Sequence, residues 1–312
     1  DGAVDGAVDG VAAQRPLPAR LRDQLELGYV GDRSTIDQLA GVLGAWPSPR
    51  HALVEGVSGS GKTRLLAELA HHALGRGWAV VYVAGTDGGV EGAFGPFLAA
   101  LPELRTNAGA LLDHGVDPAT RRAAMWLAAR DAITGGAGSA RTLLLVDDVQ
   151  WIDSQSLELV GHLLGSNDDQ LAIVVAGRSD ASSRSAWGAL RDTALRSVAT
   201  HVETRPLTVE ELRDIVRSRR PQMPASTLWA LADDLHRASG GRPGVAIVML
   251  ASLGVGSALP DRRALDVPSD LADPAQRGLS PTALRAGLGA AVLGEEFDIS
   301  TLVAVTGLSG DE

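Results

Sequence analysis

The first residue whose type and neighbours point to chemistry is Lys62. It is the one lysine among 28 lysine and arginine residues, and it lies in the run GVSGSGKT at positions 56–63. This run fits the pattern G-x-x-x-x-G-K-[ST], in which backbone amides and a lysine bind phosphates. Lysine and arginine are not interchangeable where a compact ammonium must enter a tight backbone cradle. An arginine-rich composition therefore explains the arginines but not the position of the single lysine.

The phosphate-binding pattern assigns a role to each of its residues. Its glycines permit a turn that side chains would block, and amides at the start of the following helix face the phosphates. Lys62 is expected to reach the β- and γ-phosphates and contribute to catalysis, and the Thr63 hydroxyl is expected to bind Mg²⁺. The predicted nucleotide-binding residues of this segment are Ser58, Gly59, Ser60, Gly61, Lys62, Thr63 and Arg64.

Two neighbouring acids follow a run of four aliphatic residues at positions 143–146. Such a run predicts a buried strand, and ligands bind at the carboxyl ends of strands in open parallel sheets. Asp147 is expected to hold Mg²⁺, directly or through water, and Asp148 to polarise the attacking water. The structural alternative is an Asp-rich turn after a strand.

A further basic residue, Arg178, follows the apolar run Leu171–Ala176. Strand-end placement brings it to the same sheet edge as Asp147. We expect it to sense or neutralise the γ-phosphate as a catalytic residue. The alternative is a surface arginine in a loop.

Short apolar runs alternate with helical patterns over the first two thirds of the chain, which predicts a parallel sheet covered on both faces. The fold class is therefore α/β. The expected strands are 51–57, 79–83, 142–146, 171–176 and 198–203. A helix is expected over 34–43, before the first strand, and further helices are expected over 62–74, 94–101, 120–133 and 156–164.

The pattern after position 206 divides the chain further. We expect a linker or disordered segment over 1–27, a nucleotide-binding domain over 28–206 and a helical lid over 207–256, with helices near 209–219, 226–238 and 244–253. A Pro-, Asp- and Gly-rich linker is expected over 257–279, followed by 280–312 as the start of a further domain.

The composition excludes several classes of function. The formal net charge is −10, whereas nucleic-acid-binding modules usually carry a basic face. The chain has no cysteine, so disulfides, Cys-based metal sites and thiol nucleophiles are excluded. We expect a cytoplasmic location and no membrane partner, because no signal peptide is visible and the uncharged stretch 243–260 fits a buried helix and loop.

Taken together, these residues resemble the STAND class of AAA+-related P-loop ATPases. The likeness is to the ATPase module of large bacterial transcription regulators, both LuxR-type regulators of the MalT-like kind and SARP regulators with a BTAD domain. It covers positions 15–312. The matching segments are YVGDRSTIDQL at 29–39, the P-loop at 56–63, LLLVDDVQWIDSQSLELV at 143–160, VVAGRS at 174–179, RPLTVEEL at 205–212 and ASGGRPGVA at 238–246.

The resemblance implies a five-stranded sheet of order 5-1-4-3-2, a helical lid and the start of a winged-helix domain at 280–312. It implies that Val30, Gly31 and the lid residue Pro243 hold the adenine of ATP or ADP. It also implies an effector or DNA-binding domain elsewhere in a longer protein, and a nucleotide-dependent homo-oligomer. The sequence departs from the family at Asp32, where arginine is usual, at Arg242, and at Asp148, where many relatives carry glutamate.

The sequence favours a slowly hydrolysing ATP/ADP switch that regulates transcription. A shorter carboxylate at Asp148 positions water less well, and slow hydrolysis suits a switch. The alternative is a non-hydrolysing scaffold that binds ADP and contacts other proteins. A small-molecule kinase on the same fold is disfavoured, because no acceptor-binding segment is evident and fold does not fix function.

Overall fold

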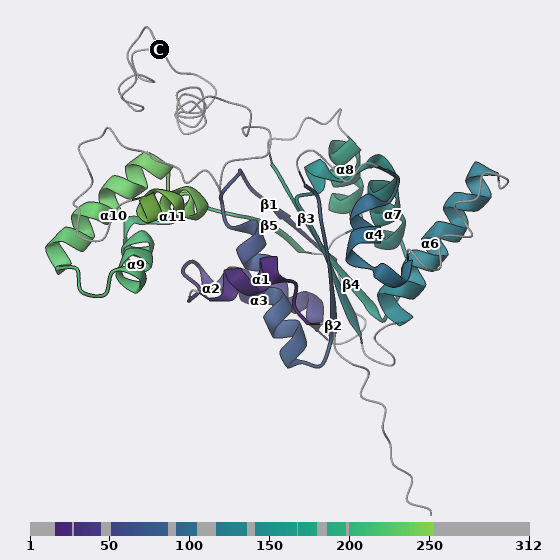
Figure 1. The fold of residues 1–312 in the computed structure, drawn as a ribbon, viewed down its shortest axis with the longest axis horizontal. Coiled ribbons are helices and arrows are strands. Elements are labelled where there is room, and N and C mark those ends of the chain that lie inside the picture. The colour runs from purple at the N-terminus through teal and green to yellow at the C-terminus, as the bar shows by residue number, and fades with distance from the viewer. Residues whose placement is uncertain are drawn as a thin grey trace, which may run out of the picture.

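The computed structural model describes residues 16–26, 28–44, 51–86, 92–104, 117–135, 141–166, 168–179, 186–197 and 200–252. Figure 1 shows a central twisted sheet with helices on both sides, and the helices after Arg205 form a separate group beyond one end of it. The predicted linker over 257–279 and the predicted winged-helix start over 280–312 lie outside the described residues.

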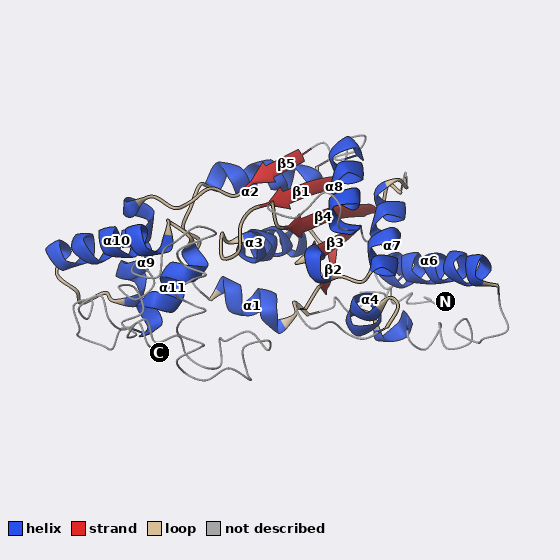
Figure 2. Cartoon of the chain, turned by 90° about the horizontal axis from the view of Figure 1, so that it is seen from above, coloured by secondary structure: helices blue, strands red, loops and turns tan. Residues whose placement is uncertain are grey.

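Five parallel strands form the sheet, in the order β2-β3-β4-β1-β5. Figure 2 shows this order from above. It is the predicted order 5-1-4-3-2 read from the opposite edge, so the predicted α/β fold is confirmed. The strands are β1 (His51–Glu55), β2 (Ala79–Ala84), β3 (Thr142–Asp147), β4 (Leu171–Gly177) and β5 (Thr200–Glu203).

Alternate residues of the strands enter two different cores. Leu143 and Leu145 of β3 pack in one cluster, whereas Leu144 and Val146 pack in the other. This alternation follows from the two-residue period of a strand, and it explains why β1, β3 and β4 are buried along their whole length. One face is covered by α1 (Ala19–Leu25), α2 (Arg33–Ala40) and α3 (Lys62–Gly75). The opposite face is covered by α4 (Gly95–Ala100), α6 (Pro118–Gly135), α7 (Ser154–Leu164) and α8 (Ala186–Ser197).

The three remaining helices form their own core. They are α9 (Val209–Arg219), α10 (Ala225–Ser239) and α11 (Pro243–Ser252), and their apolar residues make a third cluster that also includes Leu207. A capping box opens α9, in which Thr208 accepts from the Glu211 amide and Glu211 accepts from the Thr208 amide. No helix within the described part of the chain has both the length and the apolar character to cross a bilayer.

The structure differs from the prediction at the N-terminus. The expected linker over 1–27 contains the helix α1, and its Leu21 is fully buried. Leu17 and Leu25 also pack against the same core, so the helix presents an apolar face with a spacing of four residues. The acidic, glycine-rich character of positions 1–10 does not extend to this segment, and the prediction of a linker is therefore wrong for residues 19–25.

Candidate functional site

The glycine-rich loop joins β1 to α3, as its sequence predicted. Gly61 has a φ of +98°, a backbone conformation that side chains rarely adopt. A Cβ at Gly56 would lie 1.8 Å from the Thr204 hydroxyl oxygen, so glycine is required there by close approach. Lys62 is the first residue of α3, which places the loop amides at the start of a helix.

Lys62 is held within the loop. Its side chain is buried, with the residue 6% exposed, and Nζ donates to the carbonyl oxygens of Gly56 at 2.8 Å and Val57 at 3.0 Å. A buried ammonium needs such partners because desolvation of a charge is costly. The two contacts hold the charge over the loop, where phosphate oxygens would meet it.

Thr63 and Asp147 come together although 84 positions separate them in the sequence. The Thr63 hydroxyl donates to Asp147 Oδ2 at 2.7 Å. A hydroxyl and a carboxylate are the oxygen ligands that Mg²⁺ uses beside nucleotide phosphates. The donor set therefore fits Mg²⁺, and the structure brings the two predicted metal-binding residues to one point.

Asp147 lies in an unusual environment for a carboxylate. It is fully buried, and Oδ2 also accepts from the Tyr82 hydroxyl at 2.9 Å, while Oδ1 accepts from the Asp148 amide at 2.9 Å. Burial, and then the charge of Asp148, raise the pKa of Asp147 above its ordinary value. Burial and the charge of Asp147 raise the pKa of Tyr82, so Tyr82 remains a neutral donor. A bound cation would offset the desolvation of the Asp147 carboxylate.

Asp148 adopts a left-handed backbone conformation, with a φ of +49°. Non-glycine residues in this region are uncommon and often belong to functional sites. Its Oδ1 accepts from Gln150 Nε2 at 3.2 Å, and its Oδ2 accepts from Arg20 Nη2 at 2.5 Å. The predicted water-polarising carboxylate thus has one oxygen bound to an arginine of α1.

Two further motif residues near this sheet edge, Arg178 and Asp153, have different roles in the structure. Arg178 follows the end of β4, between the ends of β1 and β3, and its carbonyl accepts from Trp187 Nε1 at 3.1 Å. A phosphate-directed role for its side chain stays a prediction. Asp153, which follows the paired acids in the same sequence segment, caps α7 by accepting from the Ser156 amide at 2.9 Å.

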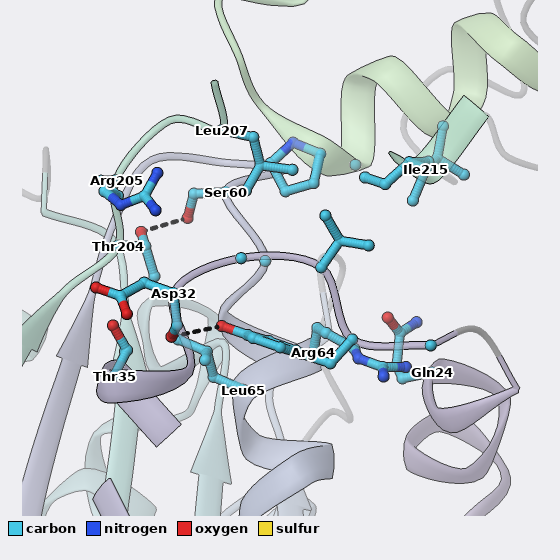
Figure 3. Close-up of a pocket in the computed structure, with 18 of the residues that line it drawn as sticks. Gln24, Asp32, Thr35, Ser60, Arg64, Leu65, Thr204, Arg205, Leu207 and Ile215 are labelled. Atoms are coloured by element: carbon cyan, nitrogen blue, oxygen red, sulfur yellow. Dashed lines mark hydrogen bonds between the residues drawn. The ribbon is translucent and has the colours of Figure 1, made fainter. Parts of the chain in front are cut away.

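A pocket opens beside the loop on the side of α2 and the lid. Figure 3 shows it between the lid helices and the N-terminal helices. Of the predicted nucleotide-binding residues, Val30, Gly31, Ser60, Gly61, Arg64 and Pro243 line it. The other lining residues are Gln24, Gly28, Tyr29, Asp32, Thr35, Leu65, Glu203, Thr204, Arg205, Leu207, Ile215, Ser218, Gly244 and Ile247. Ser58, Gly59, Lys62 and Thr63 do not line this pocket.

The lid contacts the glycine-rich loop directly. The Gly244 amide donates to the Gly59 carbonyl at 2.9 Å, and Pro243 lies against Gly61. The segment 204–206 joins β5 to the lid, and we call it the hinge. Its Thr204 hydroxyl donates to Ser60 Oγ at 2.8 Å, a contact visible in Figure 3. The loop is therefore tied to both ends of the segment that carries the lid.

Two of the departures from the family pattern have structural explanations. Asp32 is the N-cap of α2, and it accepts from the Ser34 amide at 2.9 Å. Hydrogen bonds from the Ser34 side chain and then from its amide lower the pKa of Asp32. Asp32 therefore caps a helix, where the similar proteins would carry a cation. Arg242 Nε donates to the Ser239 carbonyl at 3.0 Å, which fixes it to the end of α10.

Sequence reasoning missed four residues of the site: Arg20, Tyr29, Tyr82 and Thr204. The apolar spacing of α1 was a usable signal for the helix that carries Arg20. Tyr29 begins the matching segment 29–39 and Thr204 precedes the matching segment 205–212, but neither received a role in the prediction. Tyr82 reaches Asp147 only because β2 and β3 pair in parallel, with Ala84 opposite Asp147.

Solved structures of several proteins resemble the fold over much of the chain. Cdc6p from Pyrobaculum aerophilum is 19% identical with a TM-score of 0.49, covering 74% of this chain and 64% of that protein. The Aeropyrum pernix Orc1 protein, solved in complex with DNA, is 17% identical with a TM-score of 0.46, covering 76% and 62%. Domain III of the Thermotoga maritima replication initiation protein DnaA is 14% identical with a TM-score of 0.47, covering 93% and 97%.

This chain thus spans less than two thirds of the length of the first two proteins. Identities and TM-scores of this size do not transfer the functions of those proteins to it. The comparison with curated proteins gives no match. A family match instead covers the segment that holds the loop, Thr63 and the Asp147–Asp148 pair: residues 30–176 match the family described as the AAA ATPase domain.

Proposed function

We propose that the chain binds ATP and ADP with Mg²⁺ and hydrolyses ATP slowly. The observation that carries the proposal is the 2.7 Å contact between Thr63 Oγ1 and Asp147 Oδ2. It joins the phosphate-binding loop to the carboxylate of β3 at one point, beside the buried ammonium of Lys62. The family match to an AAA ATPase domain over residues 30–176 supports the same reading.

Each residue of the site has a defined task in this proposal. The loop amides and Lys62 bind the β- and γ-phosphates, and Thr63 and Asp147 hold Mg²⁺. When bound, Mg²⁺ would neutralise charge that develops on the phosphates during hydrolysis. Asp148 accepts a hydrogen bond from the attacking water, and Arg178 contacts the γ-phosphate. The pocket beside Val30, Gly31 and Pro243 receives the adenine.

Contacts between the glycine-rich loop and the lid can couple nucleotide binding to the position of the lid. Gly59 and Ser60 of the loop contact the lid and its hinge through Gly244 and Thr204. A nucleotide bound between the loop and the lid contacts both. A triphosphate and a diphosphate can therefore favour different positions of the lid relative to the loop. We propose that this bias serves as a switch in a bacterial transcription regulator, in line with the sequence resemblance.

Calorimetric titration with MgATP and MgADP tests the binding step. The wild type is expected to bind both nucleotides, and Lys62→Ala is expected to lose most of the affinity for each. Thermal unfolding of the variant controls for misfolding. Absence of binding by the wild type, or full affinity in a folded Lys62→Ala variant, would overturn the proposal.

A non-hydrolysing scaffold is the second candidate, and the contact between Arg20 and Asp148 favours it, because it occupies an oxygen of the predicted water-polarising carboxylate. Single-turnover hydrolysis separates the two candidates. The switch predicts slow release of phosphate by the wild type, reduced in Asp148→Asn. The scaffold predicts equal release by the wild type and the variant, at the rate of free ATP.

A further inference from the structure

The helix α1 delivers an arginine to the acids at the end of β3. Leu21 of α1 is fully buried, and the helix packs along α3, the helix that follows the glycine-rich loop. Arg20 precedes this buried anchor, and its side chain is 44% exposed, but its Nη2 lies 2.5 Å from Asp148 Oδ2. The backbone of Arg20 is therefore fixed, while its guanidinium has room to change partner.

The distances place this guanidinium at the terminal-phosphate end of the site. Arg20 Nη2 lies 3.9 Å from Asp147 Oδ2, the same oxygen that accepts from Thr63 Oγ1 at 2.7 Å. It can therefore be no farther from the Thr63 hydroxyl than the sum of these distances. In the proposed function, this hydroxyl and Asp147 would hold Mg²⁺ beside the phosphates of the nucleotide. The terminal phosphate would then lie within reach of the Arg20 guanidinium.

We propose that Arg20 is a phosphate-binding residue that exchanges Asp148 for the terminal phosphate of a nucleoside triphosphate. This inference rests on the proposed function and adds a residue to its site. The planar guanidinium presents paired donors that fit a carboxylate or a phosphate equally well. A terminal phosphate carries more negative charge than one carboxylate, and it can compete for these donors.

The exchange has a consequence for Asp148. With Arg20 on the phosphate, Asp148 Oδ2 becomes free to accept a hydrogen bond from water. With a diphosphate no such phosphate is present, and Arg20 stays on Asp148. The same side chain therefore distinguishes the two nucleotides and releases the carboxylate only when a γ-phosphate is bound.

Gln24, one helical turn after Arg20, lines the pocket beside the loop. The helix α1 therefore contributes to both ends of the site. Arg20 contacts the acids and Gln24 lines the pocket, and residues four positions apart lie on one face of a helix. Substitution at Arg20 affects the terminal-phosphate end and leaves the pocket end intact, which makes the inference separable from general nucleotide binding.

The test compares the affinities for MgADP and for a non-hydrolysable ATP analogue with Mg²⁺, measured by calorimetry. In Arg20→Ala the analogue is expected to bind about tenfold or more weakly, the usual effect of losing a charge-assisted hydrogen bond, and ADP to bind within about twofold of the wild type. The affinity of Arg20→Lys for the analogue is expected to lie between those of the wild type and Arg20→Ala. Arg22→Ala is the matched control, because Arg22 lies on the same helix and donates only to the Leu17 carbonyl among the contacts described.

Three results would overturn the inference. Equal weakening of ADP and the analogue would indicate a structural role for α1. Tighter binding of both would indicate that Arg20 merely competes with Mg²⁺ for the acids. Unchanged affinities would show no contact with phosphate. If the wild type binds neither nucleotide, the proposed function itself fails, and that result is distinct from these three.

Discussion

The two ends of the candidate site are built in different ways. At the metal end, Thr63 donates to the fully buried Asp147, and the buried ammonium of the neighbouring Lys62 donates to two carbonyls of the glycine-rich loop. The other end, called the base end because it is proposed to receive the adenine base, is the pocket. It is lined by α1, by the segment around Val30, by the hinge and by the lid helices. One end is held by hydrogen bonds between the loop helix and β3, whereas the other is assembled from residues of the loop, the N-terminal segments and the lid.

This difference suggests a division of tasks. A buried, hydrogen-bonded carboxylate is preorganised for one cation and one phosphate geometry. A pocket between a domain and a lid binds its ligand most tightly when the two are close, so occupancy is linked to domain position. In the proposed function, chemistry therefore belongs to the metal end and signalling to the base end.

The largest effect is expected from Asp147→Asn. The variant removes the charge that would bind Mg²⁺, and metal-assisted charge neutralisation contributes several kcal/mol to catalysis, so single-turnover hydrolysis should fall by about 100-fold or more. ADP binding in the presence of EDTA should stay within a few-fold of the wild type, because the base end is intact. An equal fall in hydrolysis and in ADP affinity would contradict the separation of the metal end from the base end.

A change of pH should also act on the metal end alone. Asp147 must be ionised to hold Mg²⁺, and because its pKa is raised, protons begin to compete at a higher pH than at an exposed aspartate. The ratio of ADP affinity with Mg²⁺ to that with EDTA should fall towards one as the pH is lowered, because protonation of Asp147 competes with the metal. Asp147→Asn provides the baseline, and a parallel profile in that variant would contradict this assignment.

At the base end, Thr204→Val removes the hinge contact with the loop. The hydroxyl loses its bonds to Ser60 Oγ and the Glu55 carbonyl, which also accepts from the Thr204 amide and so keeps a partner. The free energy of unfolding should fall by about 1 kcal/mol, and ADP and ATP should weaken equally, by several-fold. Thr200→Val is the control, because Thr200 begins β5, the strand that ends just before Thr204. Selective loss of ATP would place Thr204 at the metal end instead.

The smallest effect is expected within the lid. Thr208→Ala removes one half of the capping box of α9 and should cost about 1 kcal/mol. Hydrogen exchange should speed up at the amides of the first turn of α9, with exchange in β3 unchanged. Faster exchange in both elements would indicate that the lid and the sheet unfold as one unit.

The sequence predicted the metal end better than the base end, for a physical reason. A parallel sheet covered on both faces needs continuous apolar strands, and these runs located β3, β4 and the ends that carry Asp147 and Arg178. The glycine-rich motif located Lys62 and Thr63 because its backbone conformation demands those residue types.

Long-range contacts were not predictable in the same way. Arg20 reaches Asp148 across 128 positions, and the position of its guanidinium depends on how α1 packs against α3. Thr204 is one threonine after an edge strand, and only the pairing of β5 with β1 brings it to the loop. Contacts set by packing leave no local pattern. The apolar spacing of α1 was a local signal for its helix, but the prediction of a linker over 1–27 did not use it.

The most direct test of the account is calorimetric titration of MgADP into the wild type and Lys62→Arg. The loop holds a buried ammonium against two backbone carbonyls, and a guanidinium is too large and planar for that cradle. The account predicts binding by the wild type and a loss of about tenfold or more in the variant, since charge-assisted hydrogen bonds are lost. Equal affinity in a folded Lys62→Arg variant would contradict it.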